Sequence, residues 1–291
     1  IIPFTNVGYD YSRTFNVGSD KYDDVTTATN IYSGSGGLHE TYLGLGFEPF
    51  KGFSIGFNAA YIWGNITHSV VNSYSESTVN TVSKYYTSNI NNYRLTFGAQ
   101  YTAQMSRRNA ITVGATFSPG HKLGSDPTCL VINRNSQTGV ADTARYVASN
   151  AYELPTEISA GFMWNYAGKL RFGADYNLQK WGAVVTPVYA ETGNDGSYTA
   201  TKNMFSDRHK VTLGGEYVND ERSRNFFQRI RYRVGASYAT DYLKINGKNG
   251  PKELSVSAGF GIPIVNGYNN RSILNISGQW VRNSASGLIR E

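Results

Sequence analysis

The residues best suited to binding chemistry are three arginines at alternate positions, Arg229, Arg231 and Arg233. A guanidinium group holds a carboxylate or phosphate through two parallel hydrogen bonds, so this row predicts a site for an anionic group. Other charged residues at polar positions of neighbouring segments extend the candidate set: Arg171, Arg94, Glu216, Asp175 and Glu157. Because the set mixes acids and bases, it could equally form a structural charge network that stiffens a wall.

Catalytic and metal-binding chemistry find little support in the sequence. The four histidines, His39, His68, His121 and His209, are dispersed, without the spacing of metal ligands or of a catalytic triad. No Gly-x-Ser-x-Gly motif or phosphate-binding loop occurs. Cys129 is the single cysteine and cannot form an internal disulfide, and the 27 lysines and arginines are scattered. We therefore expect no enzyme, no metal or other cofactor, and no nucleic-acid partner.

Each candidate residue lies in a segment where apolar and polar residues alternate, which is the period of a β-strand. Between Tyr93 and Thr102, for example, aromatic and aliphatic residues take the odd positions and polar residues such as Arg94 take the even ones. About eleven segments follow this pattern. They are 7–17, 41–47, 53–63, 93–102, 111–117, 153–164, 170–179, 211–217, 229–238, 254–262 and 274–280. The connections between them alternate between short turns and long polar segments, as in outer-membrane barrels.

The composition excludes a helical membrane protein but allows a membrane barrel. Mean hydropathy is −0.39, and no apolar stretch approaches the roughly 18 residues of a membrane helix. Charged residues make up only 16% of the chain, against about a quarter in soluble domains. Barrel strands alternate, so their hydropathy averages out along the chain.

Two features assign the apolar face of these strands to lipid. An arginine on the lipid face at the bilayer midplane costs about 2–4 kcal/mol, so the arginine row must face an aqueous lumen. Aromatic residues also gather at both strand ends, as in the interfacial girdles of membrane barrels, whereas a soluble β-sandwich has no reason to place them there. They are Phe47, Phe53, Tyr101, Trp164 and Tyr217 near the short turns, and Tyr61, Trp63, Trp181, Tyr238, Tyr242 and Trp280 at the other end.

The sequence thus predicts an all-β fold, an antiparallel transmembrane β-barrel of the bacterial outer membrane that forms a single domain over residues 1–291. Bacterial barrels normally have an even number of strands, so an odd count of about eleven predicts strands missing from both ends. Residues 287–291 are expected to be a loop leading into an absent strand. No signal peptide is visible, so we expect a trimmed, mature chain.

Several segments resemble the FadL-type outer-membrane transporters of long-chain fatty acids and other hydrophobic compounds. The resemblance rests on LHETYLGLGFEPFKGFSIGF (38–57), YELPTEISAGF (152–162), DYNLQKW (175–181), and MFSDRHKVTLGGEY (204–217) followed by RIRYRVGASY (229–238). The wording PFKGFSIGFNAAYIWGNI is similar to the Bacteroidota version. The resemblance implies 14 strands, of which this chain carries about strands 3 to 13, without the N-terminal hatch and the last strand. It also implies lateral substrate release at Phe4–Val17, but that segment has no Pro or Gly pair that would force a kink.

Three functions follow from these expectations. The first, implied by the resemblance, is passive uptake of hydrophobic small molecules such as fatty acids, with a hydrophobic ligand held in the lumen. The alternative is a non-transporting barrel subunit of a larger outer-membrane secretion or assembly complex, with other outer-membrane proteins or lipoproteins as partners. The third is an aqueous porin, which the bulky inward arginines disfavour. All three are expected to contact outer-membrane lipid, and the sequence leaves them open.

Overall fold

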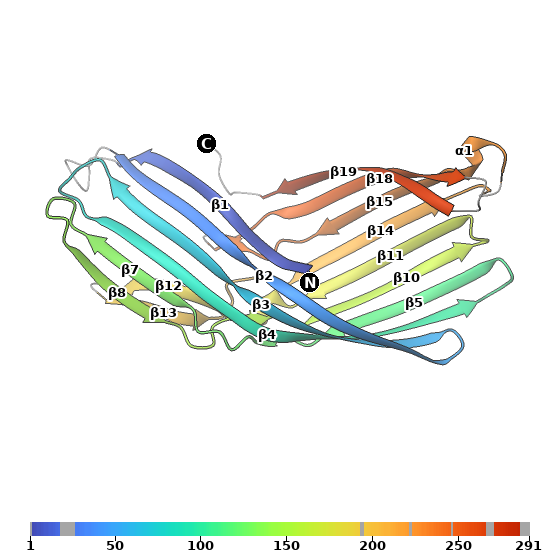
Figure 1. The fold of residues 1–291 in the computed structure, drawn as a ribbon, viewed down its shortest axis with the longest axis horizontal. Coiled ribbons are helices and arrows are strands. Elements are labelled where there is room, and N and C mark those ends of the chain that lie inside the picture. Colours follow the sequence, from blue (N-terminus) through green and yellow to red (C-terminus); the bar gives the residue numbers. More distant parts are fainter. Residues whose placement is uncertain are drawn as a thin grey trace.

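The dominant feature of the computed structural model is one antiparallel sheet whose strands follow chain order (Figure 1). The structure describes residues 2–17, 27–192, 195–220, 223–245, 247–265 and 271–285. Eleven strands form the main path: β1 (Ile2–Asn16), β2 (Thr27–Phe50), β3 (Phe53–Tyr74), β4 (Thr81–Gln104), β5 (Asn109–Ser118), β10 (Glu157–Tyr166), β11 (Leu170–Gln179), β14 (Arg208–Tyr217), β15 (Arg231–Ala239), β18 (Lys252–Val265) and β19 (Arg271–Ser284). The prediction of an all-β antiparallel fold is confirmed.

Smaller elements branch from this path or lie in the connections. Two strands, β7 (Thr128–Arg134) and β8 (Ala141–Val147), join the sheet beside β4. Short pairs are β6 (His121–Lys122) with β9 (Glu153–Leu154), β12 (Thr186–Thr192) with β13 (Asp195–Thr201), and β16 (Lys244–Ile245) with β17 (Lys248–Asn249). The helical pieces are η1 (Trp181–Ala183) and α1 (Phe226–Arg229). Among the described residues, no helix is long and apolar enough to cross a membrane.

Strand lengths divide the sheet into two parts. Strands β5, β10, β11 and β14 have 10 residues each, which matches the 9–11 residues that a tilted strand needs to cross a bilayer. Strands β2, β3 and β4 have 24, 22 and 24 residues. At about 3.3 Å per residue, their excess projects roughly 40 Å beyond the shorter strands. We call this projection, with β1, β7 and β8, the wing; it lies on the left of Figure 1, opposite α1.

Two glycines in adjacent strands mark the place where the barrel wall becomes the wing. Gly36 of β2 has a φ of 103° and Gly64 of β3 has a φ of 147°, values that side-chain-bearing residues rarely adopt. The two lie at nearly the same height, because Leu38 pairs with Gly64 while Gly36 pairs with Ile66. The regular strand backbone is therefore interrupted at nearly the same height in both strands.

Large apolar side chains of the wall are exposed rather than packed into a core. Leu45 and Val234, for example, are 70% and 66% exposed, and most outward aromatic residues are exposed by a third or more. Residues of the opposite face are small or polar, such as Gly98 and Thr116, which pair with each other. An exposed apolar band backed by a polar concave face is the arrangement of a lipid-embedded barrel wall.

Strand β1 departs from this pattern, and the prediction that its apolar residues face lipid is wrong. The register pairs Tyr9 with Gly34 and Tyr11 with Tyr32, on the same face as the buried Leu38. A register shift between Pro3 and Thr5 accompanies this inversion. Since a slip of one residue moves every side chain to the other face, this strand presents its tyrosines to the concave side of the wing.

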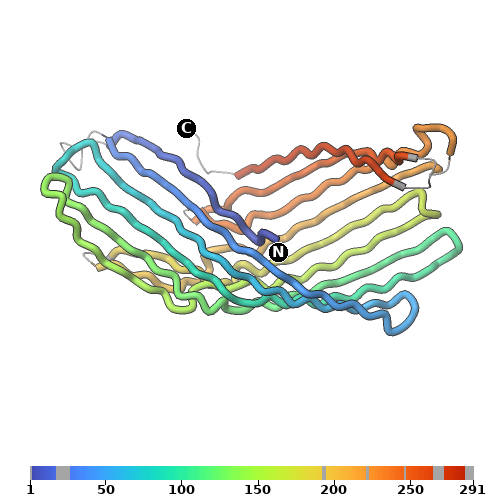
Figure 2. Tube along the Cα trace, viewed as in Figure 1, coloured from blue at the N-terminus to red at the C-terminus, as the bar shows by residue number. Residues whose placement is uncertain are grey.

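Within the described residues, β1 and β19 are the two edges of the sheet, which curls between them (Figures 1 and 2). About eleven alternating segments were predicted, and the main path has eleven strands. The expected total of 14 strands and the single-domain assignment stay predictions. The expected short turn at 263–270 overlaps the end of β18, which runs to Val265; its remainder and the expected loop at 287–291 lie outside the described residues. Of the predicted girdle aromatics, Trp181 and Tyr242 are not on strands and instead contact each other.

Candidate functional site

A charge cluster lies on the concave wall at the short-turn end of β11, β14 and β15. Glu216 accepts a hydrogen bond from Arg233, with Nε 2.7 Å from its Oε2 atom. Nη1 of Arg171 and Nη1 of Arg231 lie 3.4 and 3.8 Å from its Oε1 atom. Arg233 also donates to Oδ1 of Asn275, 2.7 Å away on β19. We call Glu216 and these three arginines the Glu216 cluster; it connects β11, β14 and β15, and the bond to Asn275 extends the connection to β19.

The arginine row predicted from sequence is shorter in the structure. Arg231 and Arg233 are on β15, but Arg229 is the last residue of the one-turn helix α1. Asn225 caps this helix by accepting the Phe227 N–H. The prediction that Arg229 continues the strand is therefore wrong, because the turn before β15 winds into a helix. Its Nε is buried without a hydrogen-bond partner among the described residues.

A second charge cluster lies where β4 parts from β5 and continues into the wing. Arg94 of β4 contacts Oε2 of Glu157, the first residue of β10, at 3.2 Å. Its other terminal nitrogen lies 4.0 Å from Glu40 of β2, a residue that is only 9% exposed. Asn177 donates to the free oxygen of Glu157 at 2.7 Å. This Arg94 cluster spans the end of β5 and fixes the branch point of the sheet.

Glu40 is a member of the Arg94 cluster that the sequence-based set missed. It occupies an even position of its strand, like Gly44 and Gly46, which the alternation places on the polar face. This even position was the feature of the sequence that could have identified Glu40. Asp175, by contrast, was expected in the charge network and joins neither cluster; no ion pair forms at its carboxylate among the described residues. The predicted single network is therefore two separate ones.

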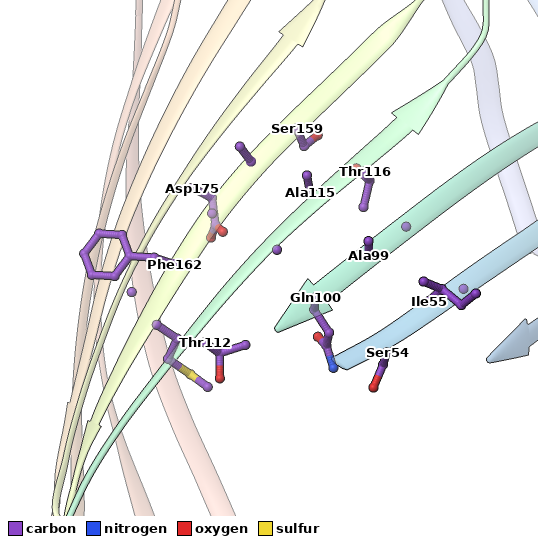
Figure 3. Close-up of a pocket in the computed structure, with 17 residues that line it drawn as sticks. Ser54, Ile55, Ala99, Gln100, Thr112, Ala115, Thr116, Ser159, Phe162 and Asp175 are labelled. Atoms are coloured by element: carbon purple, nitrogen blue, oxygen red, sulfur yellow. The ribbon is translucent and has the colours of Figure 1, made fainter. Parts of the chain in front are cut away.

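A shallow hollow of about 650 Å³ lies on the wall between the two clusters (Figure 3). Its lining comes from β3, β4, β5, β10 and β11 and consists mostly of small residues: Ser54, Gly56, Gly98, Gln100, Thr112, Gly114, Thr116, Ser159, Gly161, Gly173 and Asp175, among others. Asp175 is the charged residue of this lining. Its Oδ1 atom occupies the space that a Cβ on Gly161 would need. The hollow is open, and its lining residues include no catalytic pair.

The connection between β5 and β10 folds onto the concave side of the sheet at the base of the wing. Leu123 packs with Leu38, Ile62 and Ile90 in a buried apolar cluster. The hydroxyl of Tyr152, from the same connection, accepts a hydrogen bond from Ser88 of β4 at 3.1 Å. This segment covers the inner face of β2, β3 and β4. The sequence showed it only as a long polar loop, because its anchoring contacts are all distant in sequence.

The β12–β13 hairpin covers a second patch of the wing's concave side. Tyr198 of this hairpin is buried with Cys129 of β7 and two alanines, and Tyr86 packs against the group. Lys84 of β4 contacts Glu191 of the hairpin at 2.8 Å and lies 4.6 Å from the ring centroid of Tyr189. The hairpin therefore makes the wing a two-layered structure around β7 and β8.

We expect Cys129 to be unreactive in the folded protein. Its side chain is fully buried, and burial raises the pKa of the thiol to about 11, so very little thiolate exists at neutral pH. With a maleimide at pH 7.5, labelling should be at least about 100-fold slower than for an exposed cysteine. The rate should still rise as pH increases from 7 to 10, because this range lies below the folded-state pKa. Mass spectrometry with and without denaturant measures both effects.

The matched control is a double variant, Cys129→Ala with Gln137→Cys, which places a thiol in the exposed turn between β7 and β8. That thiol should label fully in minutes. Equal labelling of Cys129 in the native protein would show that the hairpin does not cover β7.

Breaking the Arg94 cluster is expected to loosen the junction between wall and wing. Arg94→Gln or Glu157→Gln should each cost about 1–2 kcal/mol, less than a fully buried pair, since both side chains are partly exposed. The temperature at which the folded band disappears in a heat-modifiability gel should fall by a few degrees. The double variant should lose less than the sum of the single losses.

Glu191→Gln provides the comparison, because the side chain of this wing residue is 57% exposed and its ion pair should contribute little. Strictly additive losses of stability in the Arg94–Glu157 double-mutant cycle would show that the two residues do not act together at the junction between wall and wing.

Comparisons with known proteins identify the family and the fold separately. The family model described as BamG matches residues 1–291. Among curated proteins, none matches this sequence. The structure resembles the CymD monoaromatic hydrocarbon channel, with a TM-score of 0.54 at 12% identity over 96% of this chain and 82% of that one. A Pseudomonas aeruginosa FadL homologue gives a TM-score of 0.55 at 11% identity, over 94% of this chain and 65% of that one. At such identities the likeness shows the fold alone.

The BamG match corrects the assignment to the FadL-type transporters and, with it, the expected uptake of fatty acids or other hydrophobic ligands. The resemblance held at the level of fold, because alternating glycine and aromatic residues belong to the wall of such barrels whatever they do. The family match, together with the likeness in fold, also confirms the predicted location in the bacterial outer membrane. Since the family model covers all 291 residues, the chain is an outer-membrane β-barrel that belongs to the BamG family.

Proposed function

We propose that this barrel is a non-transporting subunit of the BAM complex, which assembles proteins in the outer membrane. The observation that carries the proposal is the match of the BamG family model to the entire chain. Family membership implies partnership with the other outer-membrane proteins of that complex. In this role the chain is a structural component rather than a catalyst.

The wing supports this proposal because it supplies a large protein surface outside the lipid. It stands at the end opposite the short turns, which in outer-membrane barrels is the extracellular side. Polar residues cover much of its outer face, among them Ser33, Ser69 and Asn89. A surface of this kind suits contact with water-exposed parts of neighbouring proteins, whereas a simple pore has no need of it.

The covered concave side supports a non-transporting role. At the base of the wing, Leu123 and Tyr152 pack over the inner face of β2, β3 and β4, and the cluster of Leu38, Ile62 and Ile90 is almost fully buried. The segment is held by backbone hydrogen bonds, including Leu123 N–H to Tyr152 O at 2.8 Å. A solute moving along this wall would have to displace a packed, hydrogen-bonded segment.

Purification from the native membrane tests the proposal. An affinity tag inserted after Gln137, in the exposed β7–β8 turn, leaves the buried clusters untouched. After extraction in mild detergent, the tagged protein should co-purify with other BAM barrels and lipoproteins. Depletion of the protein should lower the amount of folded barrel proteins in the outer-membrane fraction. A monomer after mild extraction, together with normal barrel assembly on depletion, would contradict the proposal.

A further inference from the structure

Among the described residues, Arg171 and Arg233 on the concave wall at the short-turn end share the carboxylate of Glu216. In the Glu216 cluster, the guanidinium groups of Arg171 and Arg233 both lie within 4.0 Å of one carboxylate, so two positive charges share one negative charge. The side chains of Arg171 and Arg233 are 43% and 38% exposed, whereas that of Glu216 is only 16% exposed. Each guanidinium has five N–H groups in a planar fork, more than the oxygens of Glu216 can accept. The arginines thus present donors and charge to the concave side.

Three glycines, whose main chain is not covered by side chains, lie directly beside these arginines. Gly173 pairs with Gly214, and Gly214 pairs with Gly235, which forms a row of three glycines over β11, β14 and β15. Each glycine is two residues from a member of the Glu216 cluster, so it lies on the same face of the sheet. A Cβ at Gly214 would meet no atom within 4 Å. A ligand bound at the arginines could therefore rest flat against the main chain here.

The glycine row leads from the arginines to the hollow of about 650 Å³, which Gly173 and Asp175 help to line (Figure 3). This size is in the range of ligand pockets, roughly 300–1,000 Å³. Asp175 and Arg171 are four residues apart on one face of β11, so their Cα atoms are separated by about 13 Å in an extended strand. The wall therefore offers a positive site and a negative site at a fixed spacing, with Gly173 between them on β11.

We propose that this wall binds an extended peptide segment that carries a carboxylate and, about four residues away, a basic side chain. The carboxylate contacts Arg171 and Arg233, the segment runs along β11 past Gly173, and the basic side chain contacts Asp175. The spacing matches because alternate residues of an extended segment face the wall at about 6.6 Å intervals. A lipid headgroup fits less well, since the cluster is on the face opposite the apolar band. The proposal concerns this wall alone and does not require the BAM assignment.

The test uses the purified full chain in neutral detergent and a fluorescent octapeptide with Glu and Lys four residues apart in a Ser/Thr/Gly background. Fluorescence anisotropy gives the Kd. The double variant Arg171→Gln/Arg231→Gln removes two positive charges but keeps the 2.7 Å contact between Arg233 and Glu216, so it should fold. It should weaken binding at least about tenfold, which corresponds to about 1.4 kcal/mol. A heat-modifiability gel verifies that each variant is folded.

Further variants distinguish binding at the two charged sites from nonspecific electrostatic attraction. Asp175→Asn should weaken binding of the Glu/Lys peptide several-fold but not that of a Glu/Gln peptide. Arg208→Gln is the matched control, because Arg208 lies at the opposite end of the wall, 4.0 Å from Glu253, and should leave binding unchanged.

Three results would overturn the proposal. One is equal binding of a peptide in which Gln replaces Glu, and another is full affinity in the double arginine variant. The third is binding of inorganic phosphate or of phosphatidylglycerol vesicles without binding of the peptide, which would identify a different occupant. None of these results bears on co-purification with BAM proteins, so this proposal and the proposed function fail independently.

Discussion

Replacing Gly64 with valine should cause the wing to unfold locally while the barrel wall stays folded. Its φ of 147° is rarely adopted by side-chain-bearing residues, and a Cβ there would overlap the backbone oxygen of Gly37. Backbone strain of about 1–3 kcal/mol adds to this clash with an atom that cannot turn away. The same argument applies to Gly36, whose Cβ would overlap the oxygen of Asn65. We expect either substitution to cost about 3–5 kcal/mol of local stability.

Limited proteolysis measures this effect. Trypsin should cut the variant in the wing, at Lys84, Arg134 and Arg145, while fragments of the wall stay protected. Gly8→Ala is the matched control, because Gly8 is also in a wing strand but a Cβ there would meet nothing within 4 Å. If the Gly64 variant were as resistant to trypsin as the native protein, the junction between wall and wing would not depend on glycine at this position. If BAM partners contact the wing, their co-purification should fall in parallel.

Replacing Glu216 with glutamine should produce the second large effect. Three guanidinium groups would lose their shared carboxylate, and the 2.7 Å contact with Arg233 would lose its charge. Removing the shared carboxylate, whose side chain is only 16% exposed, costs about 2–3 kcal/mol, less than in a fully buried cluster because the arginines are partly exposed. The remaining like charges would repel one another. The folded band in a heat-modifiability gel should disappear at a temperature lower by on the order of 10 °C.

Two further variants distinguish the effect of the lost charge on stability from the effect of lost packing. Adding Arg171→Gln to the Glu216 variant removes one of the repelling charges and should restore part of the stability. Glu253→Gln removes a carboxylate that is 37% exposed and 4.0 Å from Arg208, and it should have little effect. A Glu216 variant as stable as the native protein at low and high salt would show that the cluster does not hold these strands together.

Function could not be read from the fold, and this chain shows why. The alternation, strand lengths and short turns that resemble the FadL-type transporters are requirements of any wall that meets lipid on one side and water on the other. They predicted the fold and the membrane correctly and the transport activity wrongly. Family membership rests on the whole sequence instead, and it favours the alternative of a non-transporting assembly subunit.

The amino-acid sequence by itself determined the strands, their approximate number and the face each presents, because alternation depends only on neighbouring residues. It also placed Arg171, Glu216 and Arg233 on one face. Where local chemistry changes the backbone, the pattern failed: Arg229 ends a helix, and β1 presents its tyrosines inward.

Only the tertiary structure decided which charged residues meet. Glu216 gathers three arginines and Arg94 reaches both Glu157 and Glu40, while Asp175 is left without an ion pair among the described residues. These contacts depend on the register of strands whose contacting residues are up to 63 positions apart in sequence. Register is fixed by turn lengths, by bulges and by where long strands leave the wall, and alternation within a single strand contains no information about any of these.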